Sequence, residues 1–352
     1  MTAMKKTKTR AVKIRTKYRW EKYTDDQLLS LRLCDLGIDT LQPRVQRWVD
    51  RVYREVARKD LQITPHHWLS DEWFSPVRVP GVAIPFYLAH PRLEQLEKAQ
   101  MLEVEGGTQQ TCLRILRHEM GHVVDHAWRL HRRRRRQELF GKSSDPYPET
   151  YSPRPYSKSY VLHLDSWYAQ SHPDEDFAET FAVWLTPNFP WRRRYQGWKA
   201  LGKLNYMSEL MEELAGKEAY VQPDEEVDSI STLEKTLGEH YQEKRERYAI
   251  DYPRFYDRDL RRLFNGDRED KTLIPACTFI RRHRSTIGSK VGRWTGVYRY
   301  AIKLVVDDMA SRCRELGLRL NGSDEQALAD FTVLLTVQTM NFVQEGRHHF
   351  SL

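Results

Sequence analysis

The sequence contains 352 residues, of which 57 are Lys or Arg and 49 are Asp or Glu, so the formal net charge is +8. Apolar residues make up 40% and aromatic residues 11%, which excludes intrinsic disorder and a collagen-like repeat for the chain as a whole. No apolar run approaches the ~20 residues that cross a bilayer. Four widely separated cysteines predict a reducing compartment, the cytoplasm, and no disulfide framework.

The positive charge is concentrated at the N-terminus of the chain. Residues 1–20 contain eight basic residues and no acidic one, and the rest of the chain contains 49 of each sign. Thr alternates with Lys or Arg in this segment and apolar residues are few, so we expect a disordered basic tail. Such a tail is suited to binding an anionic partner such as nucleic acid, separately from the function of the balanced remainder.

Ordered structure is expected to begin near Trp20. Thr24 is a suitable N-cap for a first short helix, and apolar residues at helical spacing over residues 45–56 predict a second helix. Over residues 61–88 the chain has short apolar segments interrupted by proline, which predict short strands and loops.

The elements expected after these strands are mainly helical. A long amphipathic helix is predicted over about residues 108–137. A segment rich in Ser, Pro and Tyr follows over residues 141–160, and its length indicates a functional or mobile loop. Further helices are predicted from about Pro173 to a residue before Pro187, and over about residues 191–215 and 324–343.

Together these elements predict an α+β fold that is predominantly helical, with a small sheet before the long helix. The acidic stretch at residues 223–226 is the best candidate for a domain boundary. We therefore divide the chain into a basic tail (1–20), a first domain (21–222) and a helical C-terminal region of unknown role (223–352).

The long helix contains the HExxH motif His118-Glu119-Met120-Gly121-His122. Residues four apart share one face of a helix, so both imidazoles can bind one metal ion while Glu119 reaches a metal-bound water. Two histidines on a solvated helix face are the simpler alternative. The apolar face of the helix, defined independently of the motif, is offset from the histidines and favours the metal site.

A catalytic zinc site needs a third protein ligand and an open position for water. The metzincin spacing is absent, because Asp125 and Trp128 occupy the positions of its glycine and third histidine. The thermolysin spacing is also absent, since Lys142 stands near the expected glutamate. The third ligand must therefore come from further along the chain.

Glu175 and Glu179 are the strongest candidates for the third ligand. They are four apart on a helix that its aromatic residues mark as buried, so one can bind the metal and the other can hydrogen-bond an imidazole. An acidic first turn that complements the helix dipole is the alternative interpretation. The neighbouring Asp174 and Asp176 also stay open as ligands.

In these features the chain resembles the gluzincin metallopeptidases, especially the anthrax lethal factor and Pro-Pro endopeptidase group. In that group a tyrosine precedes the ligand glutamate by seven residues, as Tyr168 precedes Glu175. An aromatic-Ala-Glu-x-Phe string then follows the glutamate, as it does at residues 177–181. Over residues 24–215 the chain is similar to a bacterial family of zinc-binding metallopeptidases.

The resemblance implies a zincin-like catalytic domain over residues 21–222 and one catalytic Zn²⁺, whose ligands would be His118, His122 and Glu175. Glu119 would take a proton from the attacking water and deliver it to the leaving amine. Tyr168 would donate a hydrogen bond to the oxyanion of the tetrahedral intermediate. The residues that would hydrogen-bond the metal ligands are Glu179 and Asp125.

Five consecutive arginines stand at the end of the predicted long helix: Arg132, Arg133, Arg134, Arg135 and Arg136. Solvated arginines favoured by the helix C-terminus are one interpretation of this run. A cationic rim that contacts an anionic substrate is the other.

We therefore expect a zinc metallopeptidase that hydrolyses a peptide bond of a peptide or protein substrate. Two alternatives stay open. A zinc amidase acting on a modified or non-protein amide shares the same transition state, so the motif cannot separate the two activities. The other is a protein that binds an anionic partner or nucleic acid and keeps a vestigial zinc site, although an intact Glu119 and Tyr168 argue against it.

Overall fold

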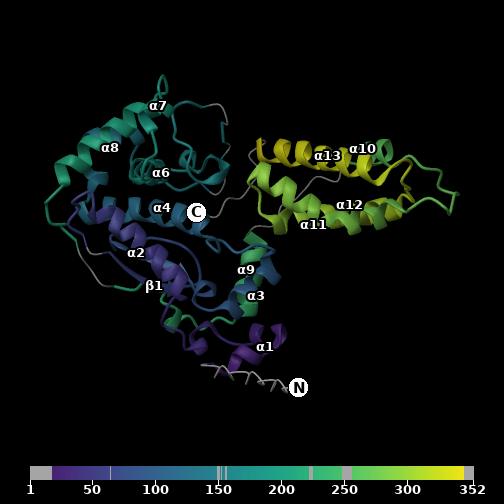
Figure 1. The fold of residues 1–352 in the computed structure, drawn as a ribbon, viewed down its shortest axis with the longest axis horizontal. Coiled ribbons are helices and arrows are strands. Elements are labelled where there is room, and N and C mark those ends of the chain that lie inside the picture. Colours follow the sequence, from purple (N-terminus) through teal and green to yellow (C-terminus); the bar gives the residue numbers. More distant parts are fainter. Residues whose placement is uncertain are drawn as a thin grey trace, which may run out of the picture.

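The computed structural model describes residues 18–63, 65–148, 151, 153–154, 157–221, 225–247 and 256–344. It is predominantly helical with a small sheet, so the predicted α+β class is confirmed (Figure 1). Most of the basic tail, parts of the 141–160 segment and part of the acidic stretch lie outside the described residues. Across the described ranges, no helix has both the length and the apolar character needed to cross a membrane.

The described residues form α-helices, strands and short 3-10 helices, which are labelled η. In chain order they are η1 (Arg19–Lys22), α1 (Asp25–Leu29), η2 (Leu33–Leu36), α2 (Pro43–Ala57), β1 (His66–Ser70), β2 (Gly81–Pro85), η3 (Phe86–Ala89), α3 (Pro91–Met101), α4 (Gln109–Trp128), η4 (Leu130–Arg132), α5 (Arg134–Phe140), η5 (Asp165–Gln170), α6 (Pro173–Leu185), α7 (Trp191–Arg194), α8 (Ala200–Leu214), η6 (Ile230–Thr232), α9 (Leu237–Arg247), α10 (Asp257–Leu263), α11 (Ala276–Thr295), α12 (Arg299–Glu315) and α13 (Asp324–Gln344).

The strands predicted over residues 61–88 form a two-stranded parallel sheet within the described part of the chain. β1 pairs with β2 in a register that places His66 opposite Gly81 and Ser70 opposite Pro85. Every residue of β2 is buried, and the strand contacts α4. The sheet therefore supports the helix that carries the HExxH motif.

The long helix predicted over residues 108–137 is shorter in the structure. Thr108 caps the start of α4, and the helix ends at Trp128. Arg129 adopts the left-handed conformation (φ 53°), and its N–H bonds back to the carbonyls of Asp125 and His126, which terminates the helix. The arginine run therefore lies on the turn and the helix that follow α4.

Of the two helices predicted directly after the 141–160 segment, the first is confirmed by the structure and the second is not. α6 begins at Pro173 and ends at Leu185, so the helix predicted to start near Pro173 and end before Pro187 is confirmed. The single helix predicted over residues 191–215 is wrong, because the structure has two helices, α7 and α8, in that range. They are separated by a turn in which Gly197 adopts a positive φ of 79°, a conformation that interrupts helical geometry.

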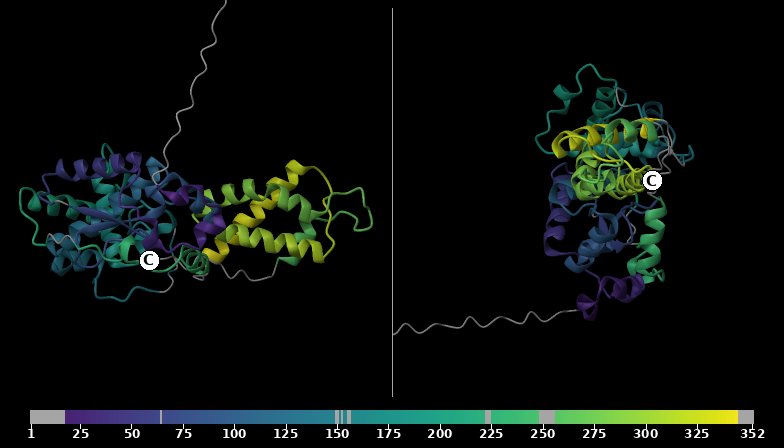
Figure 2. Two further views of the ribbon diagram at one scale, coloured as in Figure 1. Left: turned by 90° about the horizontal axis from the view of Figure 1, so that it is seen from below. Right: turned by 90° about the vertical axis from the view of Figure 1, so that its right-hand side faces the viewer.

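The described residues form two large buried clusters. The first runs from Trp20 to Tyr241 and joins α2, α4, α6, α8 and the sheet. The second runs from Tyr256 to Leu335 and lies within α10 to α13, which form a separate bundle beside the rest (Figures 1 and 2). Because Tyr241 of α9 belongs to the first cluster, that core continues past the boundary predicted at residues 223–226.

Candidate metal centre

Two histidines of α4 and one glutamate of α6 converge on a common point. His118 Nε2 lies 2.9 Å from Glu175 Oε2, and His122 Nε2 lies 3.2 Å from both of these atoms. Ligands placed about 2.0–2.2 Å from a tetrahedral zinc ion are about 3.3–3.6 Å apart, so small shifts fit the three atoms around the ion. Two imidazoles and one carboxylate are also a common donor set of catalytic zinc sites. The residues present therefore fit zinc.

The close approach of α4 and α6 brings these ligand atoms together. Gly121, inside the motif, faces Ala178 of α6, and a Cβ atom at residue 121 would lie 2.6 Å from Ala178 Cα. That distance is too short for any side chain, so the glycine permits direct contact between the helix backbones. Glu175 lies about one turn before Ala178 on α6, and this contact holds it beside the histidines.

The acidic residues of α6 each have a different partner. All four candidates for the third ligand are among the described residues, and their contacts separate them. The partners are Arg136 for Asp174, both motif histidines for Glu175, Lys203 for Asp176 and His118 Nδ1 for Glu179. Among these four, Glu175 is therefore the one that faces both Nε2 atoms.

Glu179 lies behind His118. Its Oε1 is 2.9 Å from His118 Nδ1, and its Oε2 accepts a hydrogen bond of 2.8 Å from the N–H of Leu164. The contact with Nδ1 directs the opposite ring nitrogen, Nε2, toward the cluster. The hydrogen bond expected between Glu179 and a motif histidine is thus present in the structure.

Burial and mutual charge set the protonation of the cluster. Burial opposes ionisation of Glu175, but the charge of His122 and hydrogen bonds with both imidazoles hold its pKa well below the ordinary value. Burial alone would lower the pKa of His118, yet its hydrogen bonds to Glu175 and Glu179 raise it well above the ordinary value. Glu175 is therefore ionised, the state in which a carboxylate binds a metal cation, and binding of a metal would have to release the proton that His118 holds.

Glu119 is buried beside the cluster, with 7% of its surface exposed. Burial raises the pKa of its carboxyl group, and the charges of His118 and His122 act in the opposite direction. A carboxyl group whose pKa is raised above its ordinary value is suited to accepting and returning a proton near neutral pH.

Tyr168 also lies at the cluster, on η5 directly before α6. Its ring centroid is 5.5 Å from that of His118. Burial, together with the negative charges of Glu175 and Glu119, raises the pKa of its hydroxyl group well above the ordinary value. The hydroxyl group therefore keeps its proton and can act as a hydrogen-bond donor.

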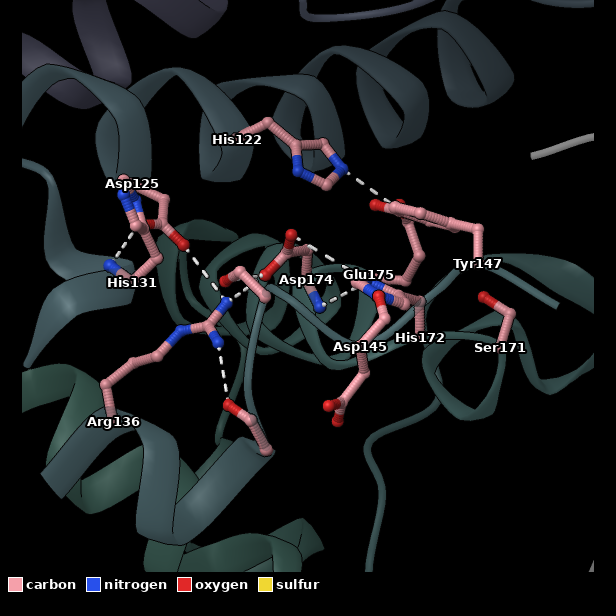
Figure 3. Close-up of polar contacts among 12 residues, drawn as sticks. His122, Asp125, His131, Arg136, Asp145, Tyr147, Ser171, His172, Asp174 and Glu175 are labelled. Carbon is pink, nitrogen blue, oxygen red and sulfur yellow. Dashed lines mark hydrogen bonds and ion pairs between the residues drawn. The ribbon is translucent and has the colours of Figure 1, made fainter. Parts of the chain in front are cut away.

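Tyr147 belongs to the site but was not predicted from the sequence. Its hydroxyl group donates a 3.0 Å hydrogen bond to Glu175 Oε1, and its ring stacks on His172 with centroids 3.6 Å apart (Figure 3). His172 Nε2 in turn lies 2.9 Å from the carbonyl oxygen of Asp145. The signal available in the sequence was the length of the Tyr-rich 141–160 segment, which predicted a functional loop.

Asp125 belongs to a buried network beside the cluster. Arg136, fully buried, donates to Asp125 Oδ2 at 3.1 Å and also to Asp174 (Figure 3). Asp125 Oδ1 accepts a 2.6 Å hydrogen bond from the N–H of His131. No hydrogen bond between Asp125 and the three cluster residues occurs in the described structure, contrary to expectation, because the turn at Arg129 folds residues 131–136 back over Asp125.

The arginine run is mostly engaged by carboxylates. The pairs on the surface are Arg133 with Glu213, Arg134 with Glu138 and Arg135 with Glu209. Because Arg136 is fully buried, the predicted contact with an anionic substrate is wrong for this residue. For Arg132 to Arg135 such a contact stays a prediction.

Comparison with known proteins gives one match. Residues 92–187 match the profile of a family described as putative zinc-binding metallo-peptidase. The matched range includes the motif helix and all three residues of the metal cluster. No curated protein and no solved structure matches the chain. The family match and the cluster support a zinc peptidase in general, and the likeness to the lethal factor group stays a prediction.

Proposed function

We propose that this protein is a zinc-dependent metallopeptidase that hydrolyses a peptide bond with water. The convergence of ligand atoms from His118, His122 and Glu175, all within 3.2 Å of one another, carries the proposal. The family match of residues 92–187, which include these three residues, also supports it. Structural zinc sites are usually closed by four protein ligands, whereas three ligands beside a buried glutamate are typical of a catalytic site.

In this proposal each residue of the site has a separate role. The three cluster residues would hold zinc, which lowers the pKa of a bound water to about 7 and polarises the scissile carbonyl group. Glu119 accepts a proton from the attacking water and returns it to the leaving amine. Tyr168 donates a hydrogen bond to the carbonyl oxygen of the substrate as negative charge develops there. Glu179 keeps His118 in its ligating orientation.

Metal analysis and hydrolysis of a defined substrate mixture test this function. We expect one zinc ion per purified chain and cleavage of peptides in a mixture of peptides and small amides. Removal of zinc by a chelator should abolish cleavage, and added zinc should restore it. Glu119→Ala should retain zinc and lose turnover, because the attacking water then lacks its proton acceptor.

The matched control is Glu325→Ala, which removes an exposed glutamate from α13 and should leave cleavage unchanged. Cleavage that persists in the chelated protein, or in Glu119→Ala, would contradict the mechanism. Cleavage of small amides without cleavage of any peptide would instead indicate an amidase.

A further inference from the structure

A cavity of about 360 Å³ opens between α2 and the loop that follows α6. Its volume lies within the range of about 300–1,000 Å³ typical of small-molecule sites. The residues that line it are Arg51, Arg54, Glu55, Arg58, Pro187 and Asn188. None of these residues belongs to the metal cluster, so the cavity is a separate feature of the molecule.

Three guanidinium groups dominate the lining. Arg51 and Arg54 lie on α2, and Arg58 directly follows its last residue. At spacings i, i+3 and i+7 the three side chains share one face, where like charges repel. Glu55 is the acidic residue of the lining, and its oxygens are already engaged. Its Oε1 accepts from Arg51 at 3.2 Å and Arg117 at 2.9 Å, and its Oε2 accepts from Arg117 at 2.8 Å.

Arg54 and Arg58 have no comparable counter-charge. Arg54 Nε donates to the backbone carbonyl of Asp50 at 3.1 Å, a neutral acceptor. Within the described residues, neither Arg54 nor Arg58 forms an ion pair with a carboxylate. Asn188 adds a neutral polar side chain from the opposite wall, in a turn where it adopts a φ of 57°. The cavity thus presents two exposed guanidinium groups that no described carboxylate pairs with, and a neutral polar side chain opposite them.

We propose that this cavity binds a small phosphate-bearing molecule. The planar guanidinium group presents parallel N–H donors that match two phosphate oxygens at once, and two such groups can hold one phosphoryl group. A single phosphate ion would fill only part of the cavity, so a phosphate ester fits it better. The guanidinium groups of the lining would hold the anionic group of such a ligand.

Calorimetric titration of the full zinc-loaded chain with inorganic phosphate and glycerol phosphate, at constant ionic strength, tests the proposal. We expect one binding site, with glycerol phosphate the tighter ligand. Arg54→Gln combined with Arg58→Gln should weaken binding at least about tenfold, which corresponds to about 1.4 kcal/mol. The matched control combines Arg258→Gln with Arg281→Gln, removing the same charge from exposed positions on α10 and α11, and should bind like the wild type.

Equal affinity for glycerol phosphate in the Arg54/Arg58 double variant and the wild type would overturn the proposal. Binding of sulfate by the wild type as tightly as inorganic phosphate would also overturn it. Phosphate bound only to zinc would give the first of these results, because the double variant keeps the metal cluster. Circular dichroism checks the fold of each variant. If the double variant does not fold, Arg58→Gln alone replaces it and must weaken binding severalfold for the proposal to stand.

Discussion

Two tyrosines approach the metal cluster from different parts of the chain. Tyr147 comes from the loop after α5, is 46% exposed and donates a hydrogen bond to Glu175 Oε1. Tyr168 comes from η5, is partly buried and lies against the ring of His118. A hydroxyl group bonded to a metal ligand affects metal affinity, whereas one directed at the substrate carbonyl affects turnover. Substitution by phenylalanine separates these roles.

For Tyr168→Phe we expect kcat to fall about 10²–10³-fold with the zinc content unchanged. The reason is the loss of one hydrogen-bond donor to the developing oxyanion, which typically raises the barrier by about 2.7–4 kcal/mol. Steady-state kinetics and metal analysis of the same preparation measure both quantities. An unchanged kcat would remove Tyr168 from the catalytic residues.

For Tyr147→Phe we expect zinc affinity to fall about 10–100-fold, because Glu175 Oε1 loses its hydrogen-bond donor. Phenylalanine keeps the stacking on His172, so the loop conformation should persist. Competition with a chromophoric chelator measures the affinity. Tyr220→Phe, at a tyrosine that is 68% exposed, is the control, and a matching loss there would show that the effect is not specific to the site.

At the scale of the elements, the contact between α4 and α6 supports the site. The metal cluster draws His118 and His122 from α4 and Glu175 from α6, so its geometry depends on the separation of these two helices. Gly121 and Ala178 set this separation because their backbones are in contact. Any side chain at residue 121 must push the helices apart.

Gly121→Ala should therefore lower the free energy of unfolding by about 1–3 kcal/mol and weaken zinc binding. The added Cβ would lie 3.0 Å from the carbonyl oxygen of Ala178, and a backbone atom cannot move aside alone. Gly202→Ala on α8 is the matched control, because beyond the backbone of its own helix a Cβ atom there would have no neighbour within 4 Å. This substitution should stabilise the helix by about 0.5–1 kcal/mol. Urea unfolding and zinc titration measure the two effects, and equal stability changes in both variants would contradict this explanation.

At the scale of the whole molecule, the bundle α10 to α13 has its own core but contacts the loop between α3 and α4. Glu103 lies near Arg299, the first residue of α12, and Glu105 lies near the side chain of Tyr298, which precedes this helix. A carboxylate at a helix N-terminus interacts favourably with the helix dipole. These two glutamates therefore place the loop between α3 and α4 beside the start of α12.

The same contact predicts a dependence of stability on pH. Burial raises the pKa of Glu103 and of Glu105 from an ordinary value of 4.5 to about 7, although Arg299 and Lys244 nearby act in the opposite direction. The folded state then holds protons that the unfolded state has lost, so this stabilisation is complete below pH 4.5 and disappears as the pH rises through 7. Chemical unfolding measures how far the free energy of unfolding falls between pH 5 and 8. This decrease should be smaller for Glu103→Gln combined with Glu105→Gln than for the wild type. Parallel pH profiles of the two proteins would contradict this prediction.

The sequence by itself determined the local elements that carry the site. Two histidines four residues apart share one face of a helix in any context, so the motif at His118–His122 could be placed on a helix in advance. The same periodicity placed Glu175 and Glu179 together on α6. These predictions depend on backbone geometry within one element, which the local sequence encodes.

Tertiary structure alone decided which side chains meet. Glu175 faces the imidazoles, whereas Asp174, its neighbour on α6, points elsewhere and pairs with Arg136, which comes from a segment folded back over the site. Tyr147 reaches Glu175 from an irregular loop, which has no periodicity to reveal its direction. These contacts join segments distant in the sequence and depend on close helix packing at Gly121. The spacing of residues along the chain predicted the candidate metal ligands. Packing between helices decided which of these side chains come together.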